Sequence, residues 1–319
     1  MTLSLADVER ARVTIAPHVH RTPLLTSRSL SERIGASAYL KAESLQRTGS
    51  FKVRGAVNAI AALTPEQRAS GIVTMSAGNH AQAVAYAAGA LGVPVFVAMP
   101  ETAPATKVAA TRGYGAEVRF APDTTKLMPI VEELRATRGL HFLHPFDDDA
   151  VMAGQGTVAL EVLDDLHDAD VIVVPVGGGG LISGIATVLA ARRKGARVYG
   201  VEPEGAQAVR RGLEAGKSVR LDAVRTVADA LAAPFAGERC LEIIRRLVAD
   251  VVVLSDEEIV AGMRLVWERA RLVVEPGGAA AVAALVAGRI PVRQGERVVA
   301  ILSGGNVDIA RAAELLVQL

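Results

Sequence analysis

An amine able to do covalent chemistry is scarce in this sequence, because only six of its 35 basic residues are lysines. Arginine keeps its proton near neutral pH, so an imine-forming amine must be one of these six. Lys52 differs from the others because it follows the flexible segment Arg47-Thr48-Gly49 and lies beside Phe51, where a helix is expected to begin. Such a position can hold an amine rigidly and keep water away from it. Lys52 is therefore the first candidate, and the alternative is a lysine whose ammonium reaches solvent.

Four consecutive glycines lie between an apolar strand and a predicted helix that begins at Leu181. Without side chains, their backbone amides can converge on a phosphate, and the helix start adds positive potential. A Walker loop is excluded because no Gly-Lys-Ser/Thr follows, and Ser183 replaces the third glycine of a dinucleotide fingerprint. The run predicts phosphate binding, and the alternative is a tight packing turn. Its members are Gly177, Gly178, Gly179 and Gly180.

A third segment, Ser76-Ala77-Gly78-Asn79-His80, also joins a predicted strand to a helix. Its free backbone amides can hold a substrate carboxylate, and the Asn79 side chain can bind a phenolic oxygen. Two alternatives stay open: Ser76 can cap its own helix without any ligand, and His80 fits a structural hydrogen bond better than proton transfer.

A fourth segment, Ser303-Gly304-Gly305-Asn306, follows a predicted strand. Ser303 then stands at the end of a parallel strand, where ligands of open α/β sheets bind, although a plain helix cap would also explain it. Zinc and acyl-transfer sites have little support. The six histidines are scattered, and no Gly-x-Ser-x-Gly elbow precedes a helix with a plausible triad. We therefore expect no metal site.

Composition narrows the class of protein. The chain has 319 residues and a formal net charge of +1, which gives no support to nucleic-acid or membrane-surface partners. The single cysteine, Cys240, allows no internal disulfide and is better explained as a buried apolar residue than as a nucleophile. Residues 1–17 lack the apolar stretch of a secretory signal. A cytoplasmic location is expected.

The elements that position these residues alternate between strand and helix from about Leu40 onward. Residues 71–100 and 171–191 carry no charge, but turn residues interrupt both, so they favour strand–turn–helix units over membrane spans. Strands are expected over 72–75, 95–98, 117–120, 141–143, 171–175, 197–201, 251–254 and 297–302. Helices are expected over 79–91, 106–111, 124–137, 149–166, 181–193 and 256–270, the last opened by a capping box of Ser255 and Glu258. The alternation predicts an α/β fold with parallel sheets covered on both faces.

Together and in this order, the segments resemble the fold-type-II pyridoxal-phosphate (PLP) enzymes, specifically the threonine/serine dehydratase and serine racemase group. The resemblance covers nearly the whole chain and rests on SLQRTGSFK, SAGNHAQAVA, VGGGGLISG, TVADALAAPFAG, LVWERARLVVEPGGAAAVAAL and LSGGNVDIA. It implies two open, parallel, doubly wound sheet domains of the tryptophan synthase β type, with PLP in the cleft between them. The expected large domain comprises residues 1–46 plus 146–319, the small domain residues 47–145, and the polar segment 144–149 is the crossing point.

The resemblance also implies a role for each segment. Lys52 would anchor PLP covalently and act as the general base that takes the α-proton. Ser303 would contact the pyridine nitrogen, and a neutral hydroxyl there would not hold that nitrogen protonated, which favours expulsion of a β-leaving group. The remaining implied cofactor contacts are Phe51 against the ring, Asn79 at the ring hydroxyl, and Gly177, Gly178, Gly179, Gly180 and Leu181 at the phosphate. The implied substrate site comprises Ser76, Ala77, Gly78, Asn79 and His80.

Several departures separate this chain from parts of the group. Racemases place a serine where this chain has Ala77, and a methyl group cannot move a proton, so a lyase is favoured. The racemases' divalent-metal site would map to Glu202, the backbone of Ala206, and Ala208. Ala208 supplies no carboxylate, so no tight divalent site is expected, and coordination through water or of a monovalent cation stays open. Asp229 is followed by alanine where the group usually has glycine, which leaves substrate choice open.

The expected activity is conversion of L-threonine, L-serine or both to a 2-oxo acid and ammonia. The alternatives are a serine racemase, a 3-hydroxyaspartate dehydratase, and a retired enzyme that only binds PLP or amino acids. The resemblance implies a homodimer. Biosynthetic threonine dehydratases continue into a regulatory domain, whereas this sequence stops at Leu319, so feedback control through such a domain is not expected.

Overall fold

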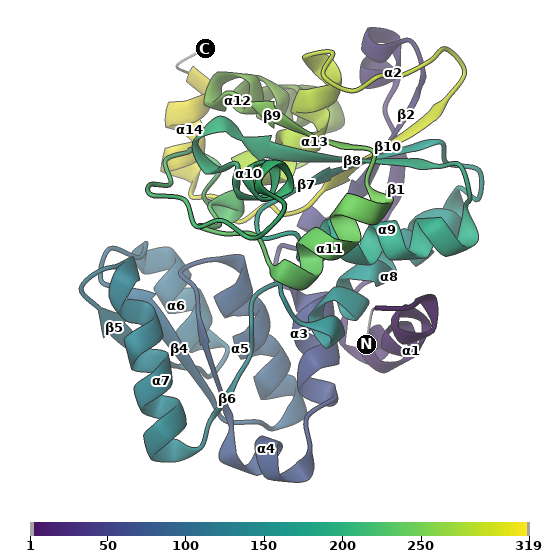
Figure 1. Cartoon of the computed structure of the whole chain (residues 1–319). Helices are drawn as coiled ribbons and strands as arrows, with labels where there is room; N and C mark the ends of the chain where they lie inside the picture. Colours follow the sequence, from purple (N-terminus) through teal and green to yellow (C-terminus); the bar gives the residue numbers. More distant parts are fainter. Residues whose placement is uncertain (1–2, 318–319) are drawn as a thin grey trace.

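Two separate β-sheets organise the computed structural model, which describes residues 3–317. In those residues the larger sheet has strand order β1-β2-β10-β7-β8-β9 and the smaller sheet has order β5-β4-β3-β6. The larger sheet contains β1 (Leu24–Thr26), β2 (Ser37–Ala42), β7 (Val171–Pro175), β8 (Arg197–Pro203), β9 (Asp250–Leu254) and β10 (Arg297–Leu302). The smaller contains β3 (Ile72–Met75), β4 (Val95–Pro100), β5 (Glu117–Ala121) and β6 (His141–Phe142). Figure 1 shows the smaller sheet and its helices below the larger sheet. The predicted α/β fold with two sheets is confirmed.

One edge of the larger sheet departs from the prediction of purely parallel strands. β1 pairs antiparallel with β2, whereas the other pairings in both sheets are parallel. The physical reason is the short connection over residues 27–36, which contains only α2 (Arg28–Ile34). A parallel neighbour needs a longer crossover, of about a dozen residues or more.

Both faces of the larger sheet are covered by helices, as the continuous apolar strands predict. Along β7, Ile172 and Val174 join one apolar core while Val171 and Val173 join another on the opposite face. The first core is completed by α1 (Leu5–Ile15), α8 (Asp149–Asp165), α9 (Gly180–Arg192) and α11 (Glu238–Leu247). The second is completed by α2, α12 (Asp256–Leu265), α13 (Pro276–Val286) and α14 (Ile309–Val317). The helix α10 (Ala208–Ala215) lies beside β9 and α11.

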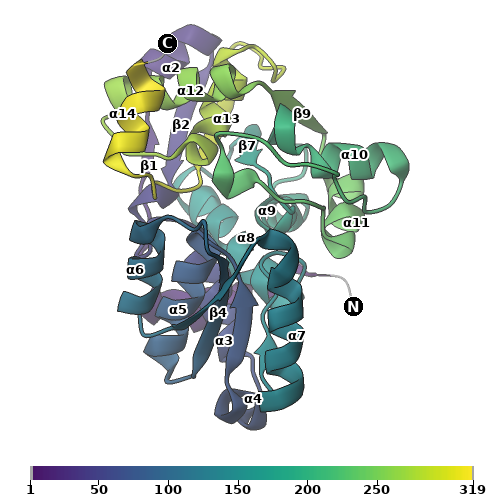
Figure 2. The ribbon, with the colours of Figure 1, turned by 90° about the vertical axis from the view of Figure 1, so that its left-hand side faces the viewer.

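The smaller sheet is also sandwiched, because Ile72 and Val73 of β3 belong to different apolar cores. One core contains residues of α3 (Lys52–Ala61), α5 (Asn79–Leu91) and α6 (Ala105–Gly113), and the other contains α7 (Leu127–Arg138). The short helix α4 (Pro65–Ser70) follows α3. Figure 2 shows α5 and α6 on one side of β4 and α7 on the other.

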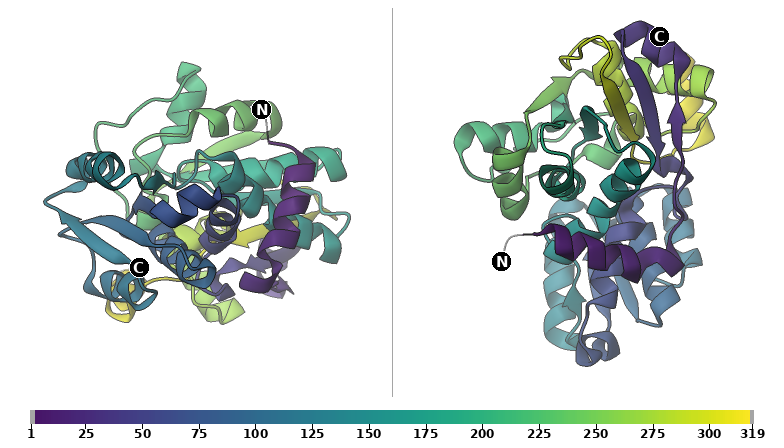
Figure 3. Two further views of the ribbon diagram at one scale, coloured as in Figure 1. Left: turned by 90° about the horizontal axis from the view of Figure 1, so that it is seen from below. Right: turned by 90° about the vertical axis from the view of Figure 1, so that its right-hand side faces the viewer.

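The helix α1 ties the two sheets together. Its Val8 and Ala11 pack into the core of the larger sheet, whereas its Ile15 packs into the core that contains α3 and α5. Figure 3 shows α1 running along the boundary between the two parts of the molecule. The strands of each sheet lie within the ranges predicted for the two domains, but the domain limits themselves stay a prediction. Residues 1–2 and 318–319 of the predicted large domain lie outside the described residues.

Most predicted elements are confirmed within one or two residues, including the α5 end at Gly92, which adopts a left-handed conformation at φ 68°. The capping box of Ser255 and Glu258 is present. One helix was predicted too long: α12 ends at Leu265, and a π-helical turn covers Val266–Ala270. Arg271 follows in a left-handed conformation at φ 58°. In the described part of the chain, no helix combines the length and apolar character needed to cross a membrane.

Candidate active site

Three of the four predicted segments meet through backbone and side-chain hydrogen bonds. The N–H of Phe51 donates to the carbonyl oxygen of Ser303 at 3.1 Å, which joins the start of α3 to the end of β10. The side chain of Asn306 donates to the Asn79 side-chain oxygen and to the Thr48 carbonyl, each at 2.8 Å. Segments separated by more than 200 positions are thus held side by side.

Lys52 begins α3, and its amine is directed into the protein although the residue as a whole is only half-buried. The amine donates to the carbonyl oxygen of Pro145 at 3.0 Å and lies 5.3 Å from the centre of the Phe51 ring. Burial lowers the pKa of Lys52 from 10.5 to about 8, because a desolvated ammonium is disfavoured against the neutral amine. The alternative of a lysine whose ammonium reaches solvent is wrong, and a fraction of this amine is neutral near pH 7.

The other lysines are engaged elsewhere or exposed. Lys41 is fully buried and forms an ion pair with Glu161 at 2.6 Å. Lys107 on α6 has only 13% of its side chain exposed and pairs with Asp229. The remaining three are exposed: Lys126, Lys194 and Lys217.

The glycine run forms the predicted loop between β7 and α9. A Cβ atom on Gly178 would lie 2.4 Å from the Phe146 ring, and one on Gly180 would lie 2.9 Å from the Phe146 carbonyl oxygen. Gly179 has φ 101°, which a residue with a side chain rarely adopts. Within residues 3–317, the backbone N–H groups of Gly177, Gly178 and Gly179 donate to no protein acceptor. Close packing is sufficient to explain why these positions are glycines. The free N–H groups are the feature that can bind an anion.

This loop lies near Lys52, because two consecutive residues, Pro145 and Phe146, contact Lys52 and the loop respectively. Pro145 accepts the hydrogen bond from the Lys52 amine, and the next residue, Phe146, packs on Gly178 and Gly180. Cys240 is buried and packs against Gly179, and burial raises the pKa of its thiol. A packing role for this cysteine, as predicted, fits that environment.

The segment between β3 and α5 lies in the same region, since Lys52 acts electrostatically on His80. Ser76 accepts a hydrogen bond from the N–H of Gly78 at 3.1 Å, while the N-cap of α5 is Gly78, without a side-chain capping bond. The alternative in which Ser76 caps the helix is therefore wrong. His80 is buried, its ring contacts the Thr74 hydroxyl at 3.0 Å, and burial lowers its pKa well below the usual value. Its side chain is a neutral structural group.

Ser303 is buried at the end of β10 and has spare hydrogen-bonding capacity. Its hydroxyl makes only one long contact among the described residues, 3.5 Å to the carbonyl oxygen of Gly277. A second polar group beside it was missed by sequence reasoning. Glu275 is fully buried, accepts a hydrogen bond from Asn79 at 2.6 Å, and has an oxygen without a partner in the described residues. Glu275 lies within the segment LVWERARLVVEPGGAAAVAAL quoted for the resemblance, but no role was predicted for it, and locally it is one acid between the apolar run Leu272–Val274 and Pro276.

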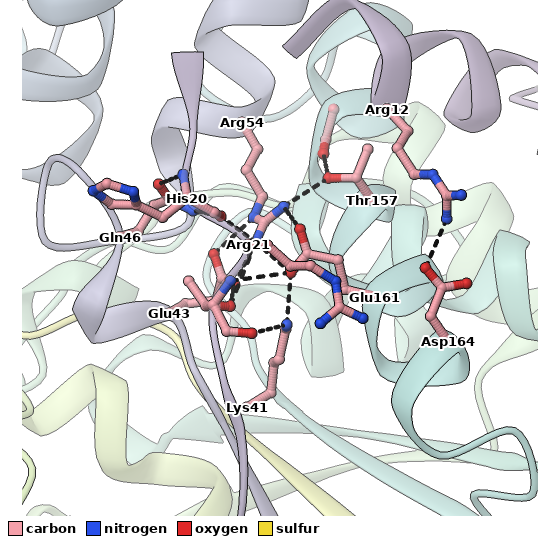
Figure 4. A network of polar contacts seen from close by, with 12 residues as sticks. Arg12, His20, Arg21, Lys41, Glu43, Gln46, Arg54, Thr157, Glu161 and Asp164 are labelled. Carbon is pink, nitrogen blue, oxygen red and sulfur yellow. Dashed lines mark hydrogen bonds and ion pairs between the residues drawn. The ribbon is translucent and has the colours of Figure 1, made fainter. Parts of the chain in front are cut away.

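A buried ion network supports the helix that carries Lys52. Arg54, fully buried two residues after Lys52, binds both oxygens of Glu43 at 2.8 Å and the two oxygens of Glu161 at 2.7 and 2.9 Å. Lys41 completes the set through Glu161. Figure 4 shows the Arg54 guanidinium between the two carboxylates, with the Thr157 hydroxyl beside it. Two positive and two negative charges thus neutralise one another.

Glu202, the residue that the resemblance placed at a metal site, has both oxygens occupied. They accept hydrogen bonds from the N–H groups of Val209 and Arg210 at 2.8 Å, at the start of α10. Among the described residues no cluster of three or more histidine, cysteine or acidic side chains could hold a metal ion.

Comparisons with known proteins agree on one family. The family described as "Pyridoxal-phosphate dependent enzyme" matches residues 15–304. A catabolic L-threonine dehydratase of Staphylococcus aureus is 42% identical over 318 residues, covering 98% of this chain and 92% of the relative. A threonine deaminase from T.th. is 44% identical with a TM-score of 0.89, covering 96% of this chain and 99% of the other. Maize serine racemase is 36% identical with a TM-score of 0.94, covering 100% and 98%.

Proposed function

Because this chain belongs to the pyridoxal-phosphate dependent enzyme family, we propose that it converts L-threonine, L-serine or both to a 2-oxo acid and ammonia. The chain is a PLP-dependent lyase, as the sequence predicted. One observation carries the choice of site: the amine of Lys52 is buried, with a pKa of about 8, next to a glycine loop whose N–H groups are free of protein acceptors in the described residues. An amine and an anion site so close suit an aldehyde cofactor with a phosphate.

The residues present fit this cofactor. We assign Lys52 as its covalent anchor, with Phe51 beside the ring, and we assign the glycine loop Gly177–Gly180 with Leu181 to its phosphate. The buried Ser303 hydroxyl, with one long contact of 3.5 Å, is assigned to the pyridine nitrogen and Asn79 to the ring hydroxyl. When bound, PLP withdraws electrons from the α-carbon of the substrate.

Lys52 also moves the proton that the reaction requires. An amine with a pKa of about 8 is partly neutral at physiological pH, so Lys52 can bond to an aldehyde. Once the amine of the substrate has displaced it, the freed Lys52 amine can accept the α-proton of the substrate. A lysine in water, with a pKa of about 10.4, is almost entirely protonated there and is a poor base. Burial is therefore the physical source of its reactivity.

The start of α5 is assigned to the substrate carboxylate. The free N–H groups of a helix start, with the helix dipole, attract an anion, and α5 has no side-chain cap at Gly78. We assign the five residues Ser76 to His80 to this role, with His80 contributing its backbone because its ring is bonded to Thr74. The substrate would then lie between this helix start and Lys52.

A serine racemase is the second candidate, because the similarity to maize serine racemase is high. Racemisation needs a second acid or base on the other face of the substrate, and Ala77 offers only a methyl group there. We therefore infer elimination as the main activity. Two further outcomes are distinguished by the test below: a 3-hydroxyaspartate dehydratase, and a catalytically inactive protein that only binds PLP or amino acids.

We further propose that residues 1–46 plus 146–319 form the large domain and residues 47–145 the small one. We also propose that the protein is cytoplasmic and that it is a homodimer, as the family resemblance implies. The net charge of +1 supports the absence of nucleic-acid and membrane partners. Sedimentation of the purified protein at several concentrations would test the dimer.

The decisive experiment combines turnover with chemical labelling. Protein reconstituted with PLP is offered L-threonine, L-serine and 3-hydroxyaspartate, and 2-oxo acid, ammonia and D-serine are measured. Borohydride reduction followed by peptide mapping should place the cofactor on Lys52, with Lys126→Ala as an exposed control that keeps the label. A label on another lysine, or a labelled protein that turns over none of the substrates, would overturn the proposal.

A further inference from the structure

Glu275 is a fully buried acid whose side chain is turned away from its own helix. It occupies the N-cap position of α13, yet its side chain makes no capping bond, although N-cap acids normally bind the first N–H groups of a helix. Oε1 instead accepts a hydrogen bond from Nδ2 of Asn79 at 2.6 Å. The carboxyl group is thus directed at a residue assigned to the cofactor.

The backbone fixes this position tightly. The N–H of Glu275 donates to the carbonyl oxygen of Gly304 at 3.1 Å, and a Cβ atom on Gly304 would lie 2.2 Å from Oε1 of Glu275. The glycine after Ser303 is therefore needed to admit the acid. Oε2 is buried and has no partner among the described residues.

A negative charge at Glu275 would have weak compensation. Two charged groups act on the pKa of Glu275: Asp229, in the short 3-10 helix Asp229–Leu231 that packs against α13, and Lys107 on α6. Asp229 repels a carboxylate, and Lys107 is already paired with Asp229. Burial and Asp229 raise the pKa of Glu275 to about 8, as expected of a buried acid that neutralises rather than remaining as an isolated charge.

Asn79 is held from both ends. Its Oδ1 accepts a hydrogen bond from Asn306 at 2.8 Å, and one hydrogen of its Nδ2 is bonded to Glu275. These two contacts fix which way the amide faces. An amide nitrogen carries two hydrogens, so one Nδ2–H stays available.

We propose that Glu275 is a positioning residue that stays protonated at neutral pH and orients Asn79, leaving the second Nδ2–H of Asn79 for the bound cofactor. The inference rests on the proposed function, because it takes Asn79 as a cofactor contact. It adds that Glu275, like Ser303, brings no negative charge to the residues assigned to the cofactor. A neutral Glu275 is therefore consistent with the role assigned to the Ser303 hydroxyl, which is to favour expulsion of a β-leaving group.

The test compares Glu275→Gln with Glu275→Leu in the holo-protein, with the absorption spectrum of bound PLP followed from pH 6 to 10. Glutamine is neutral and keeps an oxygen that can accept the hydrogen bond from Asn79. The absorption spectrum of PLP in the Glu275→Gln variant, and the pH midpoint of its change, should therefore match those of the unsubstituted protein. Leucine removes the bond, and the midpoint should shift by about one unit, since one hydrogen bond changes a proton equilibrium by roughly tenfold. A Gln shift as large as the Leu shift would show that a carboxylate is required, and an unshifted Leu variant would remove the positioning role.

A second measurement needs no cofactor. The pKa of Glu275 is higher in the folded protein, at about 8, than its ordinary value of 4.5. The folded state therefore holds this proton through a pH range where the unfolded state releases it, so stability falls as pH rises from about 4.5 to about 8. In urea unfolding of the apo-protein, Glu275→Gln should gain stability relative to the parent over that window.

The matched control is Glu202→Gln, a second buried acid that contacts α10 rather than Asn79. Whatever its effect on stability, this variant should leave the PLP spectrum unchanged. A flat pH dependence of the Glu275→Gln difference would overturn the protonated state even if the proposed function holds. Failure of the parent protein to bind PLP would instead reject the proposed function, and the apo-protein measurement would still stand.

Discussion

Lys107 on α6 forms an ion pair with Asp229, which lies in the short 3-10 helix Asp229–Leu231. The pair joins the part of the molecule around the smaller sheet to the part around the larger sheet. The two residues are 122 positions apart. Both act electrostatically on Glu275, so the pair lies near the Asn79 end of the candidate site. It therefore connects the two parts beside the proposed substrate position.

Removing this pair should weaken substrate binding. The Asp229 side chain is 58% exposed, so solvent screens the contact, and an effect of about 0.2–1 kcal/mol is expected. Lys107→Met should raise KM about two- to fivefold and reduce the dependence of KM on salt. Steady-state kinetics at several NaCl concentrations measure both effects. Lys126→Met, at an exposed lysine outside the proposed site, is the control, and an equal change there would argue against the pair.

Cofactor loading should depend on pH through Lys52. The neutral amine is the form that reacts with an aldehyde, and burial lowers the pKa of Lys52 to about 8. The rate of covalent PLP uptake by the apo-protein should rise about tenfold per pH unit below pH 8 and level off above it. Rapid mixing with detection of the bound cofactor's absorption gives this profile. A rate that kept rising beyond pH 9 would point to an unburied lysine.

Gly178 should tolerate no side chain. A Cβ atom there would lie 2.4 Å from the Phe146 ring, and forced overpacking costs about 1–3 kcal/mol. Gly178→Ala should lower PLP affinity at least tenfold and reduce stability, as measured by cofactor titration and urea unfolding. Gly113→Ala is the matched control, because an added Cβ meets nothing within 4 Å there. Equal affinity in the two variants would contradict the assigned phosphate loop.

The buried network should require Arg54. Replacing one partner of a buried ion pair leaves an uncompensated charge and costs about 3–5 kcal/mol. Arg54→Met leaves Glu43 and Glu161 with only Lys41 as a positive partner, so the urea midpoint should fall strongly and PLP uptake at Lys52 should slow. Arg28→Ala breaks an exposed pair with Glu32 and should have little effect. Similar midpoints for both variants would show that the network adds no stability.

A hydroxyl at position 77 should open the route to racemisation. Ala77→Ser places a proton-transferring group on the face of the substrate where the parent has a methyl group. D-serine formation from L-serine should become detectable, at the expense of 2-oxo acid formation. Chiral chromatography of the reaction mixture measures both products. An unchanged product ratio would remove Ala77 from the explanation of reaction choice.

The residues of the candidate site that could be predicted are those that belong to local sequence patterns. Lys52, the glycine run, the Ser76–His80 segment and Ser303 are recognisable in the sequence because each is a local turn at the end of a strand or the start of a helix. Within each parallel sheet, the carboxyl ends of the strands lie at one edge. Local chemistry therefore predicted most of the α/β elements and the position of the reactive amine.

Other features depend on contacts that no local pattern encodes. Glu275 meets Asn79 across 196 positions, and Arg54 meets Glu161 across 107. A lone acid or arginine in the sequence looks the same whether it is exposed or buried, and only packing of the two sheets removes water from it and decides its charge and partner. The sequence by itself determined the reactive groups and the elements that carry them. The tertiary structure decided which are desolvated, which are paired, and which face one another.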